Sequence, residues 1–228
     1  MRTFALDVEQ ASSLPEAVCQ IGLAQRVDDT ITDQTWNVNP GCAFDPLFSA
    51  VHGITPASVA TAPPPGPVLE ELRTIASGHI LITPSDIQRK SIQAMLWDRR
   101  AAALNVTWVS LSDVASRVWP GLFDHPSIGL TQMTVLLGLP LPGLTAAGRA
   151  RTMLQIAAHA QTVSGVPIFD WANDATRHPA ESRLPAGWPQ KRKRSAARKT
   201  TTLTKWPYGR ITAQSIPQKN PPKGRKQL

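Results

Sequence analysis

Short apolar runs separated by polar turns dominate the first 40 residues. Segments 3–8, 18–24 and 30–38 each have the apolar content or the alternation that is typical of a β-strand. Polar stretches at 11–16 and 27–30 connect them, and connections this short join antiparallel neighbours. The pattern therefore predicts an antiparallel meander of three strands.

Beyond residue 40 the pattern changes to strands that alternate with helices. The Pro-rich stretch 40–67 is expected to be irregular, apart from a short helix with Thr55 as N-cap and Pro56 at its first position. Apolar residues then recur at helical spacing in five segments: 67–76, 85–104, 112–118, 130–137 and 145–162. Two short apolar runs, 80–82 and 106–109, are predicted strands. This order predicts an α/β fold: a five-stranded mixed sheet, made of the meander plus two parallel strands, with helices on its faces.

Charge divides the chain into two unlike parts. All 16 acidic residues but only 11 of the 24 basic residues lie in 1–181, so this part carries a net −5 and the rest carries +13. A segment rich in Pro, Lys, Arg, Gln and Thr is expected to be largely disordered. We therefore predict a folded domain at 1–165, a linker at 166–181 and a basic disordered tail at 182–228.

The basic tail is a candidate for phosphate binding. Its densest cluster holds six cations and no acid: Lys191, Arg192, Lys193, Arg194, Arg198 and Lys199. Such a cluster attracts DNA or RNA with an affinity that falls steeply with salt, although a solubilising extension explains it as well. Trp171, Trp188 and Trp206 lie in or near the tail. They are candidates for stacking on bases, for docking a protein partner, or for anchoring the tail to the domain.

Membrane insertion and secretion are not expected. The sequence contains no run of about 18 or more apolar residues, and its N-terminus lacks the apolar segment of a signal peptide. Cys19 and Cys42 have no metal-ligand spacing and are expected to be buried or free thiols in a reducing compartment. These observations predict a cytoplasmic protein without membrane contact.

Candidate chemistry begins with Asp7 and Glu9 on the first predicted strand. Side chains at i and i+2 of a strand point to the same face, so the two carboxylates repel each other unless a positive charge lies between them. A divalent metal ion is the usual reason for such a pair. The alternative is that both acids lie at the frayed end of the strand and are simply solvated.

Three short motifs follow one another in a familiar order: Asp7-x-Glu9, Gln20-Ile21-Gly22 and His52-Gly53-Ile54-Thr55-Pro56. With further matches downstream, the chain resembles the DnaQ-like (DEDDh-type) 3′→5′ exonucleases of the RNase H-like superfamily, over residues 3 to about 162. The resemblance implies an RNase H-like fold and action on nucleic acid. Members of this family hold two Mg²⁺ or Mn²⁺ ions with four acids and a histidine. The ions activate a water and stabilise the leaving oxygen.

The second family motif places an acid early on a helix, and this chain offers two registers there. With Gln88 at the acid position, the inward positions are small or apolar: Ser91, Ile92, Met95 and Leu96. With Asp86 there, the inward positions include Arg89 and Lys90, which would bury charge. We therefore place Gln88 at the acid position and expect Asp86 to be a helix N-cap. A metal contact from Asp86 is the open alternative.

The third family motif, a histidine followed five residues later by an acid, is also altered. Leu144 stands at the histidine position and Arg149 at the acid position, and no acid occurs in 125–169. The resemblance therefore leaves Asp7 and Glu9 as a remnant of the catalytic site and as weak metal ligands at best. An Arg149 side chain that points inward would oppose metal binding further.

These departures predict an exonuclease-fold protein that binds nucleic acid and is catalytically impaired or inert, since loss of a general base alone costs about 10²–10⁴ in rate. Two alternatives stay open: a weakly active exonuclease that uses a single metal ion, and a protein-interaction scaffold. The five histidines have no ligand or nucleophile partner at useful spacing, so we expect surface or satisfied core positions for them. Trp97, Trp108 and Trp119 are expected to pack in the domain.

Overall fold

The computed structural model describes residues 1–28, 30–123 and 128–173, which include a five-stranded sheet of order β3-β2-β1-β4-β5. Its strands are β1 (Thr3–Gln10), β2 (Val18–Val27), β3 (Thr30–Asn37), β4 (His79–Thr83) and β5 (Val106–Ser110). The first three form an antiparallel meander, while β4 pairs parallel to β1 and β5 parallel to β4. The predicted mixed sheet is confirmed.

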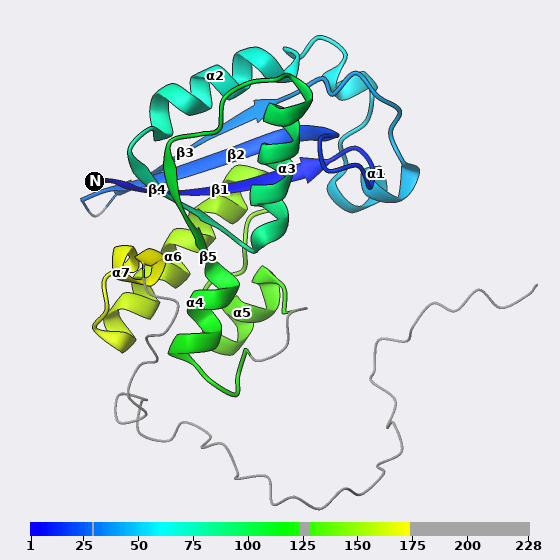
Figure 1. Ribbon diagram of the computed structural model, residues 1–228. Coiled ribbons are helices and arrows are strands. Elements are labelled where there is room, and N and C mark those ends of the chain that lie inside the picture. Colours follow the sequence, from blue (N-terminus) through cyan, green and yellow to red (C-terminus); the bar gives the residue numbers. More distant parts are fainter. Residues whose placement is uncertain (29, 124–127, 174–228) are drawn as a thin grey trace, which may run out of the picture. The chain divides into compact units, whose positions relative to one another are not determined.

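Helices cover both faces of this sheet (Figure 1). The helical elements are α1 (Pro46–His52), the 3₁₀ turn η1 (Ala57–Val59), α2 (Pro65–Ala76), α3 (Asp86–Asp98), α4 (Leu111–Val118), α5 (Leu130–Leu137), α6 (Ala146–Ser164) and α7 (Ile168–Asn173). Strand alternation divides the core: Phe4 and Leu6 pack with α2 and α3, whereas Ala5 packs with α4, α6 and α7. In the described residues, no helix is both long and apolar enough to cross a membrane.

Three segments differ from the sequence-based expectation. Helix α1 lies in the stretch expected to be irregular, where it has no buried residue and is capped by Asp45, whose carboxylate accepts a hydrogen bond from the Leu47 N–H at 2.9 Å. Helix α7 lies in the segment predicted to be a linker. It packs on the domain through Ile168 and Trp171, which are buried in the core. Helix α3 ends at Asp98, well before the expected end near residue 104.

The N-terminus of α6 lies directly against β2. A Cβ atom on Gly22 would lie 2.1 Å from the backbone carbonyl carbon of Ala146 and 2.1 Å from the nitrogen of Ala147. Two residues earlier, the Gln20 side-chain oxygen accepts a hydrogen bond from the Ala146 N–H at 3.1 Å. Since β2 pairs Gly22 with Asp7, this contact places the first turn of α6 beside the acidic end of β1.

Replacement of Gly22 by alanine is expected to destabilise the fold by about 3 kcal/mol or more, because backbone rather than a flexible side chain occupies the space of the new methyl group. Urea denaturation measures the change. The matched control is Gly129→Ala at the N-cap of α5, where φ is −79° and a Cβ meets nothing within 4 Å. It should lower stability by no more than about 1 kcal/mol. Equal urea midpoints of unfolding for the two variants would contradict the close packing of α6 on β2.

Candidate functional site

The two carboxylates of β1 lie at one wall of a cleft. Asp7 and Glu9 line it from β1, Gln88 from the first turn of α3 and Arg149 from α6, and the cleft has a volume of about 460 Å³. The Asp7 side chain is 4% exposed and that of Glu9 is 14% exposed. Both acids therefore lie inside the fold, which excludes the alternative that they are simply solvated at a frayed strand end.

Arg149 bridges the two acids. Its Nε donates to Asp7 Oδ2 at 2.5 Å, and its Nη2 donates to Glu9 Oε1. Its Nη1 donates to the backbone oxygen of Leu144 at 3.1 Å, which fixes the third nitrogen of the guanidinium. The other Asp7 oxygen accepts from the Val8 N–H at 2.9 Å. Charge-assisted bonds of this kind are among the stronger hydrogen bonds in proteins.

Local structure at the start of α6 explains the direction of this side chain. Thr145 caps the helix, because its hydroxyl oxygen accepts from the Gly148 N–H at 3.0 Å. Arg149 follows in the first turn, and the contacts of Gln20 and Gly22 hold that turn against the sheet. The guanidinium is thus directed toward β1 by packing as well as by charge.

Burial and charge act against each other at Asp7. Burial raises the pKa of its carboxyl above the ordinary value of 3.8, and the Arg149 guanidinium and the Val8 N–H oppose that rise in part. Burial likewise tends to lower the pKa of Arg149, but the attraction of Asp7 and Glu9 prevails and raises it. Arg149 therefore stays protonated, and it is the partner that compensates the acids.

The side chains of this cleft do not fit a pair of divalent metal ions. Hard cations such as Mg²⁺ need several oxygen ligands, and the two carboxylates here already bind a guanidinium. The amide oxygen of Gln88 accepts from the Ser85 hydroxyl at 3.0 Å. Within the described ranges no three residues among His, Cys, Asp and Glu come close enough to hold a metal ion.

Helix α3 follows the register that places Gln88 at the cleft. All four predicted inward residues are buried: Ser91, Ile92, Met95 and Leu96. The prediction for Asp86 was wrong, because Ser85 is the N-cap and its hydroxyl accepts from the Ile87 N–H at 3.3 Å. Asp86 occupies the first helical position, pairs with Arg89 at 3.2 Å and does not line the cleft of Asp7. These contacts of Asp86 do not support the alternative in which its carboxylate binds a metal ion beside Asp7.

The other predicted site residues do not contribute their side chains to the cleft in the described part of the chain. The Leu144 side chain is 93% exposed, so this residue acts at the site only through its backbone oxygen. Sequence reasoning missed that oxygen, since a carbonyl contact has no residue-type signal. It also missed Val51 on α1, which is 85% exposed and is another residue that lines the cleft. The six cations of the tail cluster lie outside the described residues.

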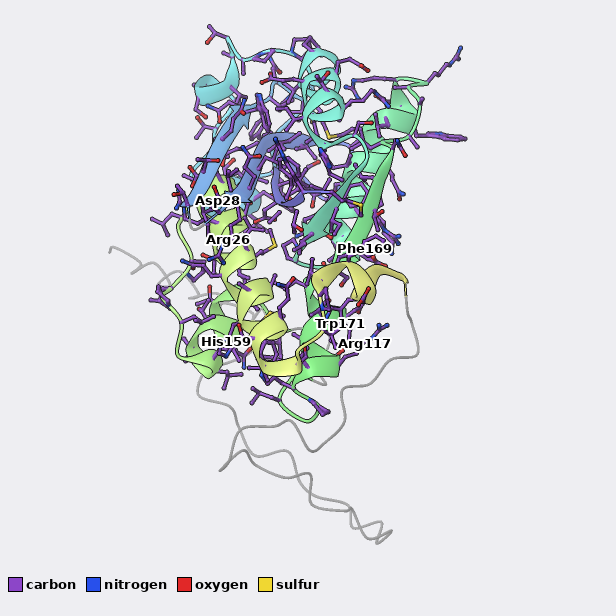
Figure 2. All side chains as sticks on the ribbon, turned by 90° about the vertical axis from the view of Figure 1, so that its left-hand side faces the viewer. Arg26, Asp28, Arg117, His159, Phe169 and Trp171 are labelled. Atoms are coloured by element: carbon purple, nitrogen blue, oxygen red, sulfur yellow. The ribbon has the colours of Figure 1, made fainter. Side chains whose placement is uncertain are left out.

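Two histidines and one tryptophan have structural contacts. His52 holds the loop around it, because its Nδ1 accepts from the Ile54 N–H at 3.0 Å and its Nε2 lies 3.0 Å from the Gln10 carbonyl oxygen. His159 of α6 stacks on the buried Trp119 with ring centroids 5.7 Å apart. Trp171 of α7 is 6% exposed and lines a small hollow with Arg117 of α4 (Figure 2). It therefore anchors α7 to the domain rather than being available to bases.

Comparison with solved structures identifies the fold. No protein-family model and no curated protein matches the sequence. The chain is similar to exonuclease X, solved in complex with 5′-overhanging duplex DNA, with 19% identity and a TM-score of 0.57 over 75% of this chain and 98% of that one. It is similar to the nuclease domain of 3′hExo, a DEDDh family member bound to rAMP, with 15% identity and a TM-score of 0.56 over 71% and 92%.

A third similar structure is exonuclease I, with 13% identity and a TM-score of 0.59. The match covers 71% of this chain and 41% of that one, so the domain spans less than half of exonuclease I. Two of these structures are exonucleases, and the third is the nuclease domain of a DEDDh family member. The chain therefore has the fold of the DnaQ-like exonucleases, as the sequence motifs predicted.

Replacement of Arg149 by alanine is expected to destabilise the domain by about 3–5 kcal/mol near neutral pH, because it leaves buried Asp7 without a cation. The deficit should shrink as the pH is lowered. Without Arg149 the folded-state pKa of Asp7 rises further above 3.8, so the native state binds the extra proton and stability falls as pH rises through that window. Urea denaturation at several pH values measures both effects.

The matched control is Arg151→Ala on the same helix. Arg151 pairs with Asp33 at 2.8 Å at the surface, where its side chain is 42% exposed. Surface pairs contribute about 0–1 kcal/mol, so this variant should lose little stability at any pH. A loss for Arg149→Ala no larger than the loss for Arg151→Ala would contradict a stabilising role for the buried bridge.

Proposed function

We propose that this protein is a nucleic-acid-binding member of the exonuclease fold in which Arg149 replaces the metal ions and hydrolysis is impaired or lost. The observation that supports this proposal is the bridge from Arg149 to both Asp7 and Glu9. It engages the two carboxylates that the fold supplies from β1 for metal binding. An arginine supplies charge, but it offers no site at which a water can be activated as a nucleophile.

The charge at the cleft also opposes the chemistry of phosphodiester cleavage. Two carboxylates and one guanidinium leave a net −1 at the point where metal ions would supply several positive charges. A scissile phosphate that approached this point would meet repulsion rather than a compensating cation. Gln88 is neutral, and Leu144 directs its side chain to solvent, so the cleft has neither the acid nor the base of the altered motifs.

Binding of nucleic acid is supported by the neighbours and by the charge distribution. Exonuclease X was solved with duplex DNA and the nuclease domain of 3′hExo with rAMP. The stretch 182–228 carries 13 basic residues and no acid, which favours phosphate contacts that release counterions. We propose that this tail provides most of the affinity for nucleic acid and that the folded domain provides the shape that the nucleic acid fits. A cytoplasmic location and independence from Mg²⁺ or Mn²⁺ for binding are parts of the same proposal.

End-labelled oligonucleotides test both halves of this proposal. The intact chain is incubated with 5′-labelled single-stranded DNA and RNA in Mg²⁺, Mn²⁺ or EDTA, and binding is measured by anisotropy on the same molecules. We expect no shortening from the 3′ end and binding that weakens steeply with salt. Binding should weaken further when the six cations Lys191, Arg192, Lys193, Arg194, Arg198 and Lys199 are changed to glutamine.

Three results would contradict the proposal in different ways. Metal-dependent shortening that disappears in Asp7→Asn identifies a working single-metal exonuclease. Absence of binding at low salt points instead to a protein-interaction scaffold. Binding that is equal before and after neutralisation of the six tail cations removes the tail from the interaction.

A further inference from the structure

Trp97 of α3 is 86% exposed, although a tryptophan was expected to pack in the domain. The reason is the phase of the helix. The buried residues Ser91, Ile92, Met95 and Leu96 define the inward face of α3. At 100° per residue, Trp97 lies almost opposite their centre, at the middle of the solvent-facing side. An exposed tryptophan gives up the stabilisation that burial of its large apolar surface would provide at an inward position.

Polar and basic residues accompany Trp97 on this outer face. Lys90 lies two turns earlier on the same stripe, about 10.5 Å away along the axis, and Gln93 lies between them. Both are exposed. Arg100 follows three residues after Trp97, is exposed, and donates its N–H to the Trp97 carbonyl oxygen at 2.9 Å. Along the chain Trp97 therefore lies between two cations, Lys90 on α3 and Arg100 in the turn that follows the helix; we refer to Lys90, Gln93, Trp97 and Arg100 as the α3 stripe.

The two cations of the α3 stripe are available to an external ligand. In the part of the chain that the structure describes, neither Lys90 nor Arg100 forms a salt bridge. The acids nearby are already paired, Asp86 with Arg89 at 3.2 Å and Asp98 with Arg99 at 3.2 Å. Four cations and two acids between 86 and 100 leave this segment with +2, in a domain whose first 181 residues sum to −5.

We infer that the α3 stripe binds single-stranded nucleic acid, with one base stacked on Trp97 and the flanking phosphates held by Lys90 and Arg100. An aromatic face between cations is the arrangement that sequence-tolerant single-strand binding uses. The first turn of α3 contributes Gln88 to the cleft, and Trp97 lies nine residues later, about 13.5 Å along the axis and on the opposite side of the helix. A strand bound in the cleft therefore reaches Trp97 only by passing around α3. This inference rests on the proposed nucleic-acid binding and assigns part of it to a surface outside the cleft.

The charges favour this occupant over a protein. A protein partner that covered Trp97 would need to desolvate Lys90 and Arg100 or bring acids to both, whereas a nucleic acid brings a phosphate on each side of every base. Because the centre of the cleft is net negative, a strand also gains more from phosphate contacts along α3 than from contacts beside Asp7.

Binding of a fluorescein-labelled single-stranded oligonucleotide to the intact chain tests the inference. We expect Trp97→Ala to weaken binding about 5- to 150-fold, the effect of losing one stacked base. Trp97→Phe should retain most of the affinity, and Trp97→Leu, which is apolar but not aromatic, should not. An abasic oligonucleotide of equal length should bind the parent protein and Trp97→Ala equally, because only the base contact is removed.

Three controls separate loss of base stacking at Trp97 from a general loss of apolar surface, charge or stability. Val135→Ala on α5 removes another exposed apolar side chain, 63% exposed, and should leave binding unchanged. Lys90→Gln should reduce the dependence of log K on log salt by about 0.7 for a single strand. Because Trp97 is exposed, its variants should melt at the parent temperature.

Three outcomes would overturn the inference. Parent-like affinity of Trp97→Ala, with salt-dependent binding otherwise intact, would show that nucleic acid binds elsewhere and would leave the proposed function standing. Absence of oligonucleotide binding by the parent chain at low salt would contradict both the inference for Trp97 and the proposed function. Equal losses for Trp97→Ala on normal and abasic oligonucleotides would exclude base stacking as the cause.

Discussion

The structure depends on the charge balance at the acidic end of β1. A buried strand that carries Asp7 and Glu9 on one face is destabilised unless a cation lies between them, because desolvation and mutual repulsion both oppose the charged forms. Arg149 supplies that cation from α6, which lies 142 residues away in sequence from Asp7. The contact of α6 with β2, which is so close that only glycine fits at residue 22, holds Arg149 within reach of both acids. The position of α6 and the charge of the cleft are thus linked through this one ion-pair bridge.

An arginine and a metal ion satisfy this constraint in chemically different ways. A metal ion exchanges with solvent, accepts further oxygen ligands and can activate a bound water. A guanidinium is tethered, donates hydrogen bonds in one plane and stays protonated. With Arg149 in place the two carboxylates gain a permanent stabilising contact. In the proposed function, the same contact takes the place of metal ions and leaves the cleft for binding.

Sequence predicted those features that depend on local periodicity. Alternation in residues 3–38 predicted the meander, and the inward phase of α3 distinguished Gln88 from Asp86. Features that depend on tertiary contacts were not accessible. Helix α1 has no buried residue and so no periodic signal, and the direction of Arg149 is set by a contact between α6 and β2. The expectation for Trp97 was wrong because its apolar character was given more weight than its phase on α3.

Titration of Mn²⁺ by isothermal calorimetry tests the replacement of metal by Arg149 most directly. The intact chain should show no saturable binding at the cleft, because both carboxylates are engaged by the guanidinium. Arg149→Ala should acquire a Mn²⁺ site that also raises its melting temperature, and the second change Asp7→Asn should abolish that site. Saturable Mn²⁺ binding by the unaltered protein that is lost in Asp7→Asn would contradict the claim that Arg149 takes the place of the metal.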